Sequence, residues 1–176
     1  MGRRAMIRPA SAQDEDAIDA VHARCVADAF AGLLGDYLPP REQRVERARS
    51  WAGPIGSPHP RHALLVAERA ACLVGFTAVG PTRDRDDDRL TTGELRVLMV
   101  DAAERGRGVG LALVAGGEQA MRECGLADAT LWVADANARA QRFYERCGWR
   151  ADGAKRVSEV DGREIKTVRY RTRLAR

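Results

Sequence analysis

An apolar, strand-like run followed by alternating glycines carries the strongest chemical signal in this 176-residue sequence. The run ends at Val100 and leads into the turn Arg105-Gly106-Arg107-Gly108-Val109-Gly110, behind which a helical pattern begins. Glycines let backbone N–H groups turn toward an anion with no Cβ in the way. A helix N-terminus adds unpaired donors and the positive end of its dipole. We expect this turn to bind a pyrophosphate; the alternative is a surface loop that only begins a helix.

Three common nucleotide motifs do not fit this turn. A Walker A loop requires Gly-Lys-Ser/Thr, and the turn contains no lysine. In a dinucleotide fingerprint the third glycine comes one residue later than Gly110, and an acidic residue follows about 20 positions on, which is missing here. An S-adenosylmethionine site has no phosphate to explain the two arginines. Residues 111–176 are also too few for the rest of a doubly wound sheet.

Two other groups of ligand-type residues predict no metal site. The segment from Pro81 to Arg89 holds four aspartates, but it lacks the glycine and the distal glutamate of a calcium loop, and arginines interrupt it. We expect a solvated hairpin tip there. His59 and His62 have no acidic or thiol partner at ligand spacing, so we expect loop histidines. The four cysteines form no CxxC pair, which indicates reduced thiols.

The composition excludes several classes of protein. The hydrophobic share of 45% can form the core of one domain over residues 1–176. The net charge is +4, but arginines alternate with acids and aromatics make up only 5%, which is typical of a salt-bridged surface and not of a nucleic-acid interface. No apolar run approaches the ~20 residues of a membrane-spanning helix, and no secretory signal is visible. We therefore expect a cytoplasmic protein with no nucleic-acid or membrane partner.

The periodicity predicts a domain in which strands outnumber helices. Strands are expected at 5–8, 63–68, 72–79, 94–100, 130–134, 150–160 and 163–174. Helices are expected behind Ser11, from Pro40, over 109–124 and over 137–147. The segment 94–134 is a strand–helix–strand unit, which predicts a parallel pair with a right-handed crossover. Asp161-Gly162 predicts the turn of a closing hairpin.

These motifs resemble the GCN5-related N-acetyltransferase (GNAT) superfamily. Arg105-x-x-Gly108-x-Gly110 is similar to its acetyl-CoA signature, and Asn137-x-x-Ala140-x-x-Phe143-Tyr144-x-x-x-Gly148-Trp149 is similar to its second signature. Shorter segments also resemble bacterial members: Ile7-Arg8-Pro9-Ala10, Gly32-Leu33-Leu34 and Val168-Arg169-Tyr170. Asp101-Ala102-Ala103 departs from the pattern, because members often have proline there. The resemblance implies an α/β (α+β) fold with a mixed, mostly antiparallel sheet of about seven strands and about four helices.

The resemblance implies that the sheet splays between its fourth and fifth strands and admits acetyl-CoA there. The pantetheine arm would run alongside Leu98, Met99 and Val100, and a backbone N–H of Leu98 or Met99 would polarise the thioester carbonyl. The pyrophosphate would be held by backbone amides of seven residues: Arg105, Gly106, Arg107, Gly108, Val109, Gly110 and Leu111. Asn137 would contact the pantetheine or the adenosine-phosphate arm, with helix capping as the competing role.

Two side chains are implied as catalytic. Tyr144 aligns with the family's general acid, which protonates the departing thiolate; the competing role is packing beside Phe143. Glu94 stands where several members place a general base that takes a proton from the acceptor amine. By strand alternation it would share a face with Arg96, Leu98 and Val100. The equally weighted alternative for Glu94 is an ion pair with an arginine.

The function implied is direct transfer of acetyl from acetyl-CoA to a primary amine, without a covalent enzyme intermediate and without a metal. One alternative is a non-catalytic acyl-CoA-binding or regulatory module, and another is an arginine-based nucleic-acid binder. The acceptor stays open between small-molecule and peptide amines. Asp36, Glu42 and Glu46 could attract a cationic amine, although a solvated helix face explains Glu42 and Glu46 equally well. The terminal hairpin is a candidate edge for a homodimer.

Overall fold

The computed structural model describes residues 4–30, 40–52, 60–160 and 163–174. Within these ranges seven strands form one sheet: β1 (Met6–Pro9), β2 (Ala63–Arg69), β3 (Cys72–Pro81), β4 (Thr92–Val100), β5 (Asp128–Ala134), β6 (Arg150–Val160) and β7 (Arg163–Arg173). Four α-helices accompany them: α1 (Glu15–Phe30), α2 (Arg41–Ala52), α3 (Val109–Glu123) and α4 (Ala138–Arg146). The expected elements are confirmed with shifts of a few residues at their ends. The predicted Asp161-Gly162 turn, the Gly32–Leu34 segment, Asp36 and His59 lie outside the described residues.

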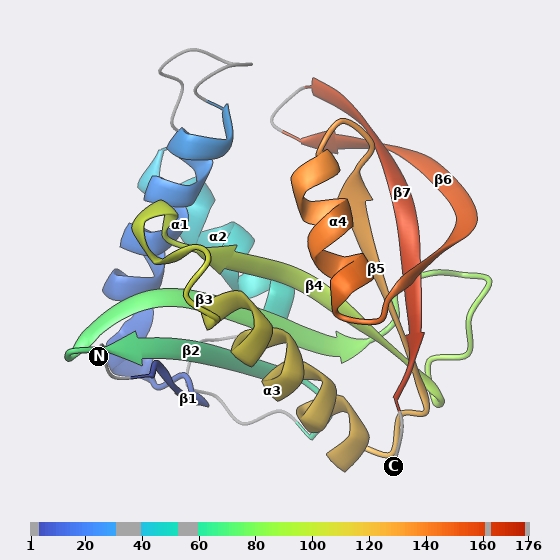
Figure 1. The fold of residues 1–176 in the computed structure, drawn as a ribbon, viewed down its shortest axis with the longest axis horizontal. Coiled ribbons are helices and arrows are strands. Elements are labelled where there is room, and N and C mark those ends of the chain that lie inside the picture. The colour runs from blue at the N-terminus through green and yellow to red at the C-terminus, as the bar shows by residue number, and fades with distance from the viewer. Residues whose placement is uncertain (1–3, 31–39, 53–59, 161–162, 175–176) are drawn as a thin grey trace.

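The strands are ordered β1-β2-β3-β4-β5-β7-β6 across the sheet. Neighbouring strands run antiparallel, except β4 and β5, which are parallel. The parallel pair is the strand–helix–strand unit that the sequence predicts, with α3 as its crossover. The mixed, mostly antiparallel sheet is thereby confirmed. Figure 1 shows β4 and β5 leaving one another in different directions from a common lower corner.

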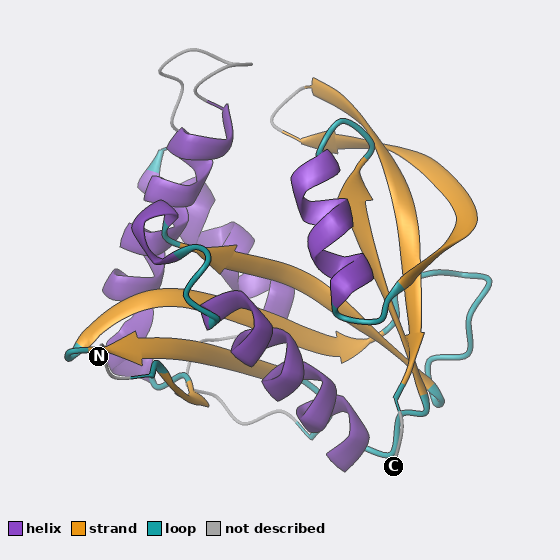
Figure 2. Cartoon of the chain, in the orientation of Figure 1, coloured by secondary structure: helices purple, strands orange, loops and turns teal. Residues whose placement is uncertain are grey.

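Helices lie on both faces of the sheet (Figure 2). On one face α1 packs Ile18, Val21 and Cys25 against β2, β3 and β4. On the other face α3 and α4 share one apolar cluster, to which α3 contributes Val114 and α4 contributes Tyr144. Cys25 is a buried member of the core. No helix in the described ranges is both long and apolar enough to cross a membrane.

A β-bulge interrupts β4 just before the segment with the strongest chemical signal. Ala78 of β3 pairs with Val97, but the next residue, Val79, pairs with Leu95, so Arg96 is the extra residue. Leu95 accordingly packs with the α3 cluster, whereas Val97 packs with the α1 cluster. Strand alternation breaks at this point.

The bulge corrects one expectation about Glu94. Leu98 and Val100 belong to the α3 side of the core. Leu95 also lies on that side, so its neighbour Glu94 points to the opposite face. Glu94 therefore does not share a face with Leu98 and Val100, because the inserted Arg96 reverses the alternation between them.

The connection from β2 to β3 contains two alanines in the left-handed region, with φ of 51° at Ala70 and 62° at Ala71. A two-residue hairpin turn of this kind matches the right-handed twist of the strands it joins. A residue with a Cβ is sterically strained in that conformation, because only glycine adopts it without a steric penalty. The connection between these two predicted strands is therefore a tight turn that carries backbone strain at both alanines.

Candidate active site

The parallel strands β4 and β5 pair over a very short length. Their ladder runs from Thr92, opposite Asp128, to Glu94, opposite Thr130. Beyond Glu94, β4 pairs only with β3, and beyond Thr130, β5 pairs only with β7. We call this divergence the fork. Backbone N–H and C=O groups that have no strand partner along its two arms need other acceptors and donors, which water or a ligand can supply.

The glycine turn lies at the open end of the fork, between β4 and α3. Gly106 and Gly108 have φ of 74° and 82°, and nothing lies within 4 Å of where a Cβ would stand on either. Gly108 is the N-cap of α3 and supplies no side-chain cap, and the first helical bond runs from Ala112 N–H to the Gly108 carbonyl at 3.0 Å. The N–H groups of Val109, Gly110 and Leu111 therefore have no carbonyl partner within the helix, whereas the Arg105 N–H donates to the Ala102 carbonyl at 3.3 Å. The geometry is that of an open, positively polarised anion cradle.

The two arginines of the turn have different surroundings. Arg105 bonds to Asp28 of α1 at 2.6 Å and holds the pKa of that carboxyl below its usual value. Arg107 is 61% exposed and lies 3.8 Å from Glu104. Arg105 therefore ties the turn to α1, while Arg107 extends into solvent beside the cradle.

Helix α4 lies against the start of α3. A Cβ on Gly110 would stand 3.2 Å from the Phe143 ring, so glycine permits this close approach. Asn137 begins α4 by accepting a hydrogen bond from Ala140 N–H at 3.0 Å. This is the capping role expected as one of two for Asn137.

Tyr144 is buried, with 8% of its surface exposed. Its ring meets Phe143 edge-on at 5.3 Å and lies 6.3 Å from the ring of Trp149. Burial raises the pKa of Tyr144 above its ordinary value, so the phenol is protonated at neutral pH. The structure thus shows the packing expected as one alternative, and the burial of Tyr144 favours the protonated phenol that the other alternative requires.

Glu94 lies at the base of the fork on the face opposite α3. Arg83 donates to both of its carboxylate oxygens, at 2.8 and 3.0 Å. Arg96 Nε lies 3.8 Å from the same carboxylate. Burial, with Arg83 nearby, lowers the pKa of Arg96 to about 10. The ion pair that the sequence left open as an alternative is therefore present.

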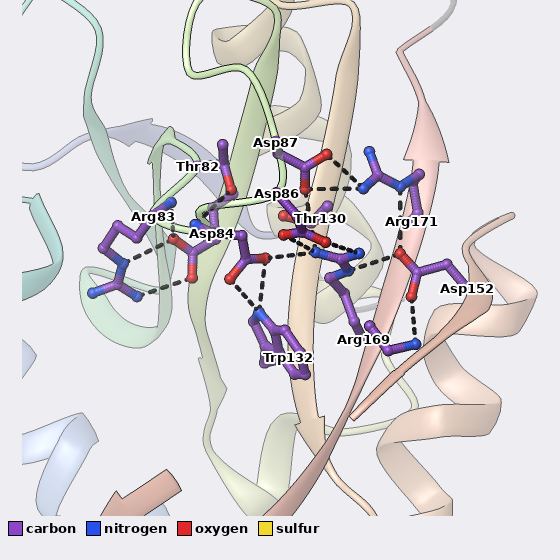
Figure 3. Close-up of polar contacts among 12 residues, drawn as sticks. Thr82, Arg83, Asp84, Asp86, Asp87, Thr130, Trp132, Asp152, Arg169 and Arg171 are labelled. Carbon is purple, nitrogen blue, oxygen red and sulfur yellow. Dashed lines mark hydrogen bonds and ion pairs between the residues drawn. The ribbon is translucent and has the colours of Figure 1, made fainter. Parts of the chain in front are cut away.

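Next to this pair, a network of charges joins the β3–β4 loop to β5, β6 and β7 (Figure 3). The indole N–H of Trp132 donates to both oxygens of Asp84 at 3.0 Å. Arg156 donates to Asp84 at 3.1 Å, and its guanidinium lies 4.0 Å from the centre of the Trp132 ring. Arg169 bonds to Asp84, to Asp86 at 2.8 Å and to Asp152 at 2.7 Å.

The expectation of a solvated hairpin tip is wrong for part of this loop. The side chains of Asp84 and Asp87 are only 5% and 9% exposed. The carboxylates of Asp84, Asp86 and Asp87 approach one another within 4.8 Å. Guanidinium groups lie among them: Arg169 bonds to all three and Arg171 to Asp87. Arginine therefore supplies the positive charge that keeps these acids together.

Sequence reasoning missed four residues of this face: Arg83, Trp132, Arg156 and Arg169. The available signal was the run of aspartates together with the arginines spaced two apart at 169 and 171, which place both cations on one face of a strand. The pairing of these charges could not be predicted from that signal, because Asp84 and Arg169 are 85 residues apart in the sequence. Only the strand order brings them together.

Comparison with known proteins gives consistent matches. A model of the acetyltransferase (GNAT) family matches residues 27–149. A mycothiol acetyltransferase of Thermobispora bispora is 37% identical over 142 residues, which cover 78% of this chain and 43% of that protein. One of Propionibacterium freudenreichii is 39% identical over 109 residues, which cover 61% of this chain and 32% of that protein. The chain thus spans less than half the length of these curated relatives.

Solved structures match over almost the whole chain. A ribosomal-protein-alanine N-acetyltransferase from Brucella melitensis has a TM-score of 0.69 and 25% identity, over 96% of this chain and 99% of that one. A GNAT superfamily phosphinothricin acetyltransferase from Sinorhizobium meliloti, in complex with AcCoA, has a TM-score of 0.73 and 18% identity, over 97% and 89%. The fold is shared with both.

Proposed function

Because this chain belongs to the acetyltransferase (GNAT) family, we propose that it transfers an acetyl group from acetyl-CoA directly to a primary amine. The observation that carries the proposal is the combination of the fork with the open glycine cradle at the head of α3. The fork offers unpaired backbone to an extended ligand, and the cradle offers unpaired amides to its anionic end.

The cradle fits a pyrophosphate by its own geometry. No Cβ fills the space over Gly106 and Gly108, and the exposed Arg107 stands beside it. In our proposal the pyrophosphate is held by the amides from Gly106 to Leu111. The expected contribution of the Arg105 amide is not retained, because its N–H donates to the Ala102 carbonyl. Asn137, exposed at the start of α4, contacts the same ligand in addition to capping its helix.

The arms of the fork would align the reacting group. The pantetheine arm lies along Leu98, Met99 and Val100, and acetyl-CoA supplies an acetyl group already activated as a thioester. An N–H of Leu98 or Met99 stabilises the negative charge that develops on the carbonyl oxygen. Backbone donors suit this task because the rest of the sheet holds them in place.

Tyr144 would donate a proton to the departing thiolate. Its raised pKa supports the role of donor, because the phenol remains protonated at neutral pH. Glu94 would accept the acceptor's proton through water, and this role requires one oxygen to be shared between Arg83 and that water. The bulge turns Glu94 toward the face away from α3 and α4, the face on which α1 packs against β2, β3 and β4.

The same observations favour one second candidate, a non-catalytic acyl-CoA-binding module. Glu94 is engaged by Arg83 and Tyr144 is packed between two rings. Such a module would bind CoA and acetylate no amine.

A thermal-shift series with acetyl-CoA, CoA, NAD and S-adenosylmethionine tests the proposal, because a ligand that binds only the folded state raises Tm. We expect a rise with acetyl-CoA and CoA alone, followed by release of free CoA when amines are added. The absence of a rise with either CoA species would contradict the proposed function. Binding without turnover on a broad amine panel would favour the second candidate.

For partners, we propose a small-molecule or peptide amine and no nucleic acid. Many of the described arginines are paired with acids, as Arg8 is with Asp14 and Arg44 with Asp19, so they do not form a free basic stripe. We also propose a homodimer through β6, because that strand lies at the edge of the sheet.

A further inference from the structure

Helix α1 carries two opposite charges that meet two opposite charges in the segment before the glycine turn. Arg24 donates to both carboxylate oxygens of Asp101, each at 2.8 Å. One helical turn later, Asp28 pairs with Arg105 at 2.6 Å. The two charges are four residues apart in both segments and their signs run in the opposite order, so each charge meets its counterpart. We call these two ion pairs the brace.

The core fixes the position of the brace. Cys25 follows Arg24 in α1, is 7% exposed and belongs to the cluster that joins α1 to β2, β3 and β4. Burial raises the pKa of Cys25 to about 11. The charges that also act on this thiol are those of Asp101, Arg105, Arg24 and Asp28. All four members of the brace therefore lie close to one buried group, and core packing holds α1 at a set distance from the segment 101–105.

A third ion pair ties the same segment to β2. Arg69, the last residue of β2, donates to Glu104 at 2.5 Å, and the two side chains are 16% and 17% exposed. The Glu104 N–H donates to the Asp101 carbonyl at 2.9 Å and so closes the 3₁₀ turn at 102–104. Each charged residue from 101 to 105 thus pairs with a residue of another element.

This fixed segment leads directly into the open glycines. Gly106 follows Arg105, and the other end of the turn is fixed at Gly108, whose carbonyl accepts the first bond of α3. Glycine loses more conformational freedom on ordering than any other residue. A ligand that must order a loose loop binds more weakly by the cost of that ordering, so anchoring both ends of the turn favours binding.

We propose that Arg24 and Asp28 are positioning residues for acetyl-CoA. Through Asp101 and Arg105 they hold the glycine turn in the shape that receives the pyrophosphate. This inference rests on the proposed function, because it concerns the same cradle. The Arg105 side chain serves the turn through Asp28, while Arg107 extends into solvent beside the cradle.

Binding of acetyl-CoA to four variants of the full chain tests the proposal. Arg24→Gln and Asp28→Asn each break one ion pair of the brace, and the double variant breaks both. The matched control is Arg49→Gln, because Arg49 of α2 also pairs with an acid of α1, Glu15, and is 49% exposed against 54% for Arg24. Isothermal titration gives Kd, steady-state kinetics give kcat and the KM for acetyl-CoA, and Tm is measured without ligand.

We expect each single substitution in the brace to raise Kd about threefold and the double substitution about tenfold, the upper end for exposed ion pairs. The rise should appear in the KM for acetyl-CoA and not in kcat, because the brace touches no reacting atom. Without ligand, Tm of each single variant should fall by no more than about 4 °C, since such exposed pairs add little stability.

Arg49→Gln should keep the Kd of the wild type. An unchanged Kd in the double variant, an equal rise in Arg49→Gln, or a loss confined to kcat overturns the proposal.

Amide exchange without ligand separates this proposal from the proposed function. The N–H groups of Glu104 and Arg105 are bonded within the 3₁₀ turn. Their exchange, resolved by NMR, should be about tenfold faster in the double variant, because the segment opens more often without the brace, and unchanged in Arg49→Gln. Equal exchange in the wild type and the double variant overturns the positioning role. Failure of acetyl-CoA to raise Tm of the wild type would instead count against the proposed function.

Discussion

Arg83 donates to both carboxylate oxygens of Glu94 across the loop that joins β3 to β4, at 2.8 and 3.0 Å. Arg96 approaches the same carboxylate from the bulge, so one buried acid serves two arginines. Glu94 therefore holds the base of the fork together whether or not it also handles a proton. A structural role and a proton-accepting role for Glu94 predict different effects of substituting Glu94 and Arg83.

Glu94→Gln should destabilise the protein by about 3–5 kcal/mol, because it leaves the buried Arg96 without its acid. Urea unfolding measures this loss. Arg83→Gln is the matched control, and it should cost less because Arg83 is half-exposed. If Glu94 is also the base, folded Glu94→Gln loses the acidic limb of its pH–rate profile while Arg83→Gln retains it. Equal profiles would remove the base role.

Tyr144→Phe should lower kcat by about 10²–10⁴-fold, the usual contribution of a general acid, and leave acetyl-CoA affinity nearly unchanged. The substitution keeps both ring contacts, with Phe143 and with Trp149. Single-turnover acetylation and the acetyl-CoA thermal shift measure the two quantities separately. An unchanged kcat would assign Tyr144 to packing alone.

Gly108→Val should abolish the acetyl-CoA thermal shift, because a Cβ would enter the open cradle at a φ of 82°. Gly125→Val is the matched control at the opposite end of α3, with a φ of 77° and equally open space. Both variants should lose stability by about 1–2 kcal/mol from left-handed strain. Only Gly108→Val should lose binding; normal binding in a folded Gly108→Val would refute the assignment of the turn.

Ala70→Asn with Ala71→Gly should stabilise the protein by about 1 kcal/mol or more. Both positions have positive φ, and Asn-Gly is the favoured pair for such a turn. Chemical denaturation of the double variant checks the gain. Ala103→Gly, in the short 3₁₀ turn at 102–104, is the comparison and should give no such gain. A loss of stability in the double variant would show that these alanines carry no strain.

Asp14→Asn should destabilise the protein at neutral pH by about 1–3 kcal/mol, since Asp14 accepts hydrogen bonds from Arg8 and from Ser11. The Arg8 guanidinium holds the pKa of Asp14 well below its usual range. A lowered folded-state pKa gives stability that is present above the unfolded value of about 3.9 and is lost as pH falls. The difference between wild type and Asp14→Asn should therefore be constant from pH 7 to about 5 and shrink below about pH 4.

Asp16→Asn is the control for this pH series, because its side chain is 88% exposed in its pair with Arg41. We expect little change from it at any pH. If the Asp14→Asn difference persisted unchanged into acid, the Arg8 pair would not be its source.

Local patterns predict most of this fold and one part of its site. Gly108 and Asn137 are the N-caps of α3 and α4. Both helix starts could be predicted because a capping residue and its helix are only a few residues apart in the sequence. The bulge could not be predicted, because β4 has no glycine or proline at Arg96 and the extra residue is defined only by pairing with β3. The loop of aspartates was wrongly predicted to be solvated for a related reason. The burial of Asp84 depends on Trp132 and Arg169, which come from strands distant in the sequence.

The short overlap of β4 and β5 has a consequence for how the protein opens. Only three residue pairs join the ladder of β1–β4 to that of β5–β7. The Asp84 network and the apolar cluster shared by α3 and α4 also connect these halves, through side chains and not through the sheet. Proteins open in cooperative units that separate where contacts are few. Each half should therefore exchange its amide hydrogens as a separate unit, and the amides of the short β4–β5 ladder should exchange first. A molecule bound in the fork would contact both halves and make them open together as one unit. Its binding should therefore slow amide exchange across both halves, far beyond the residues that it touches.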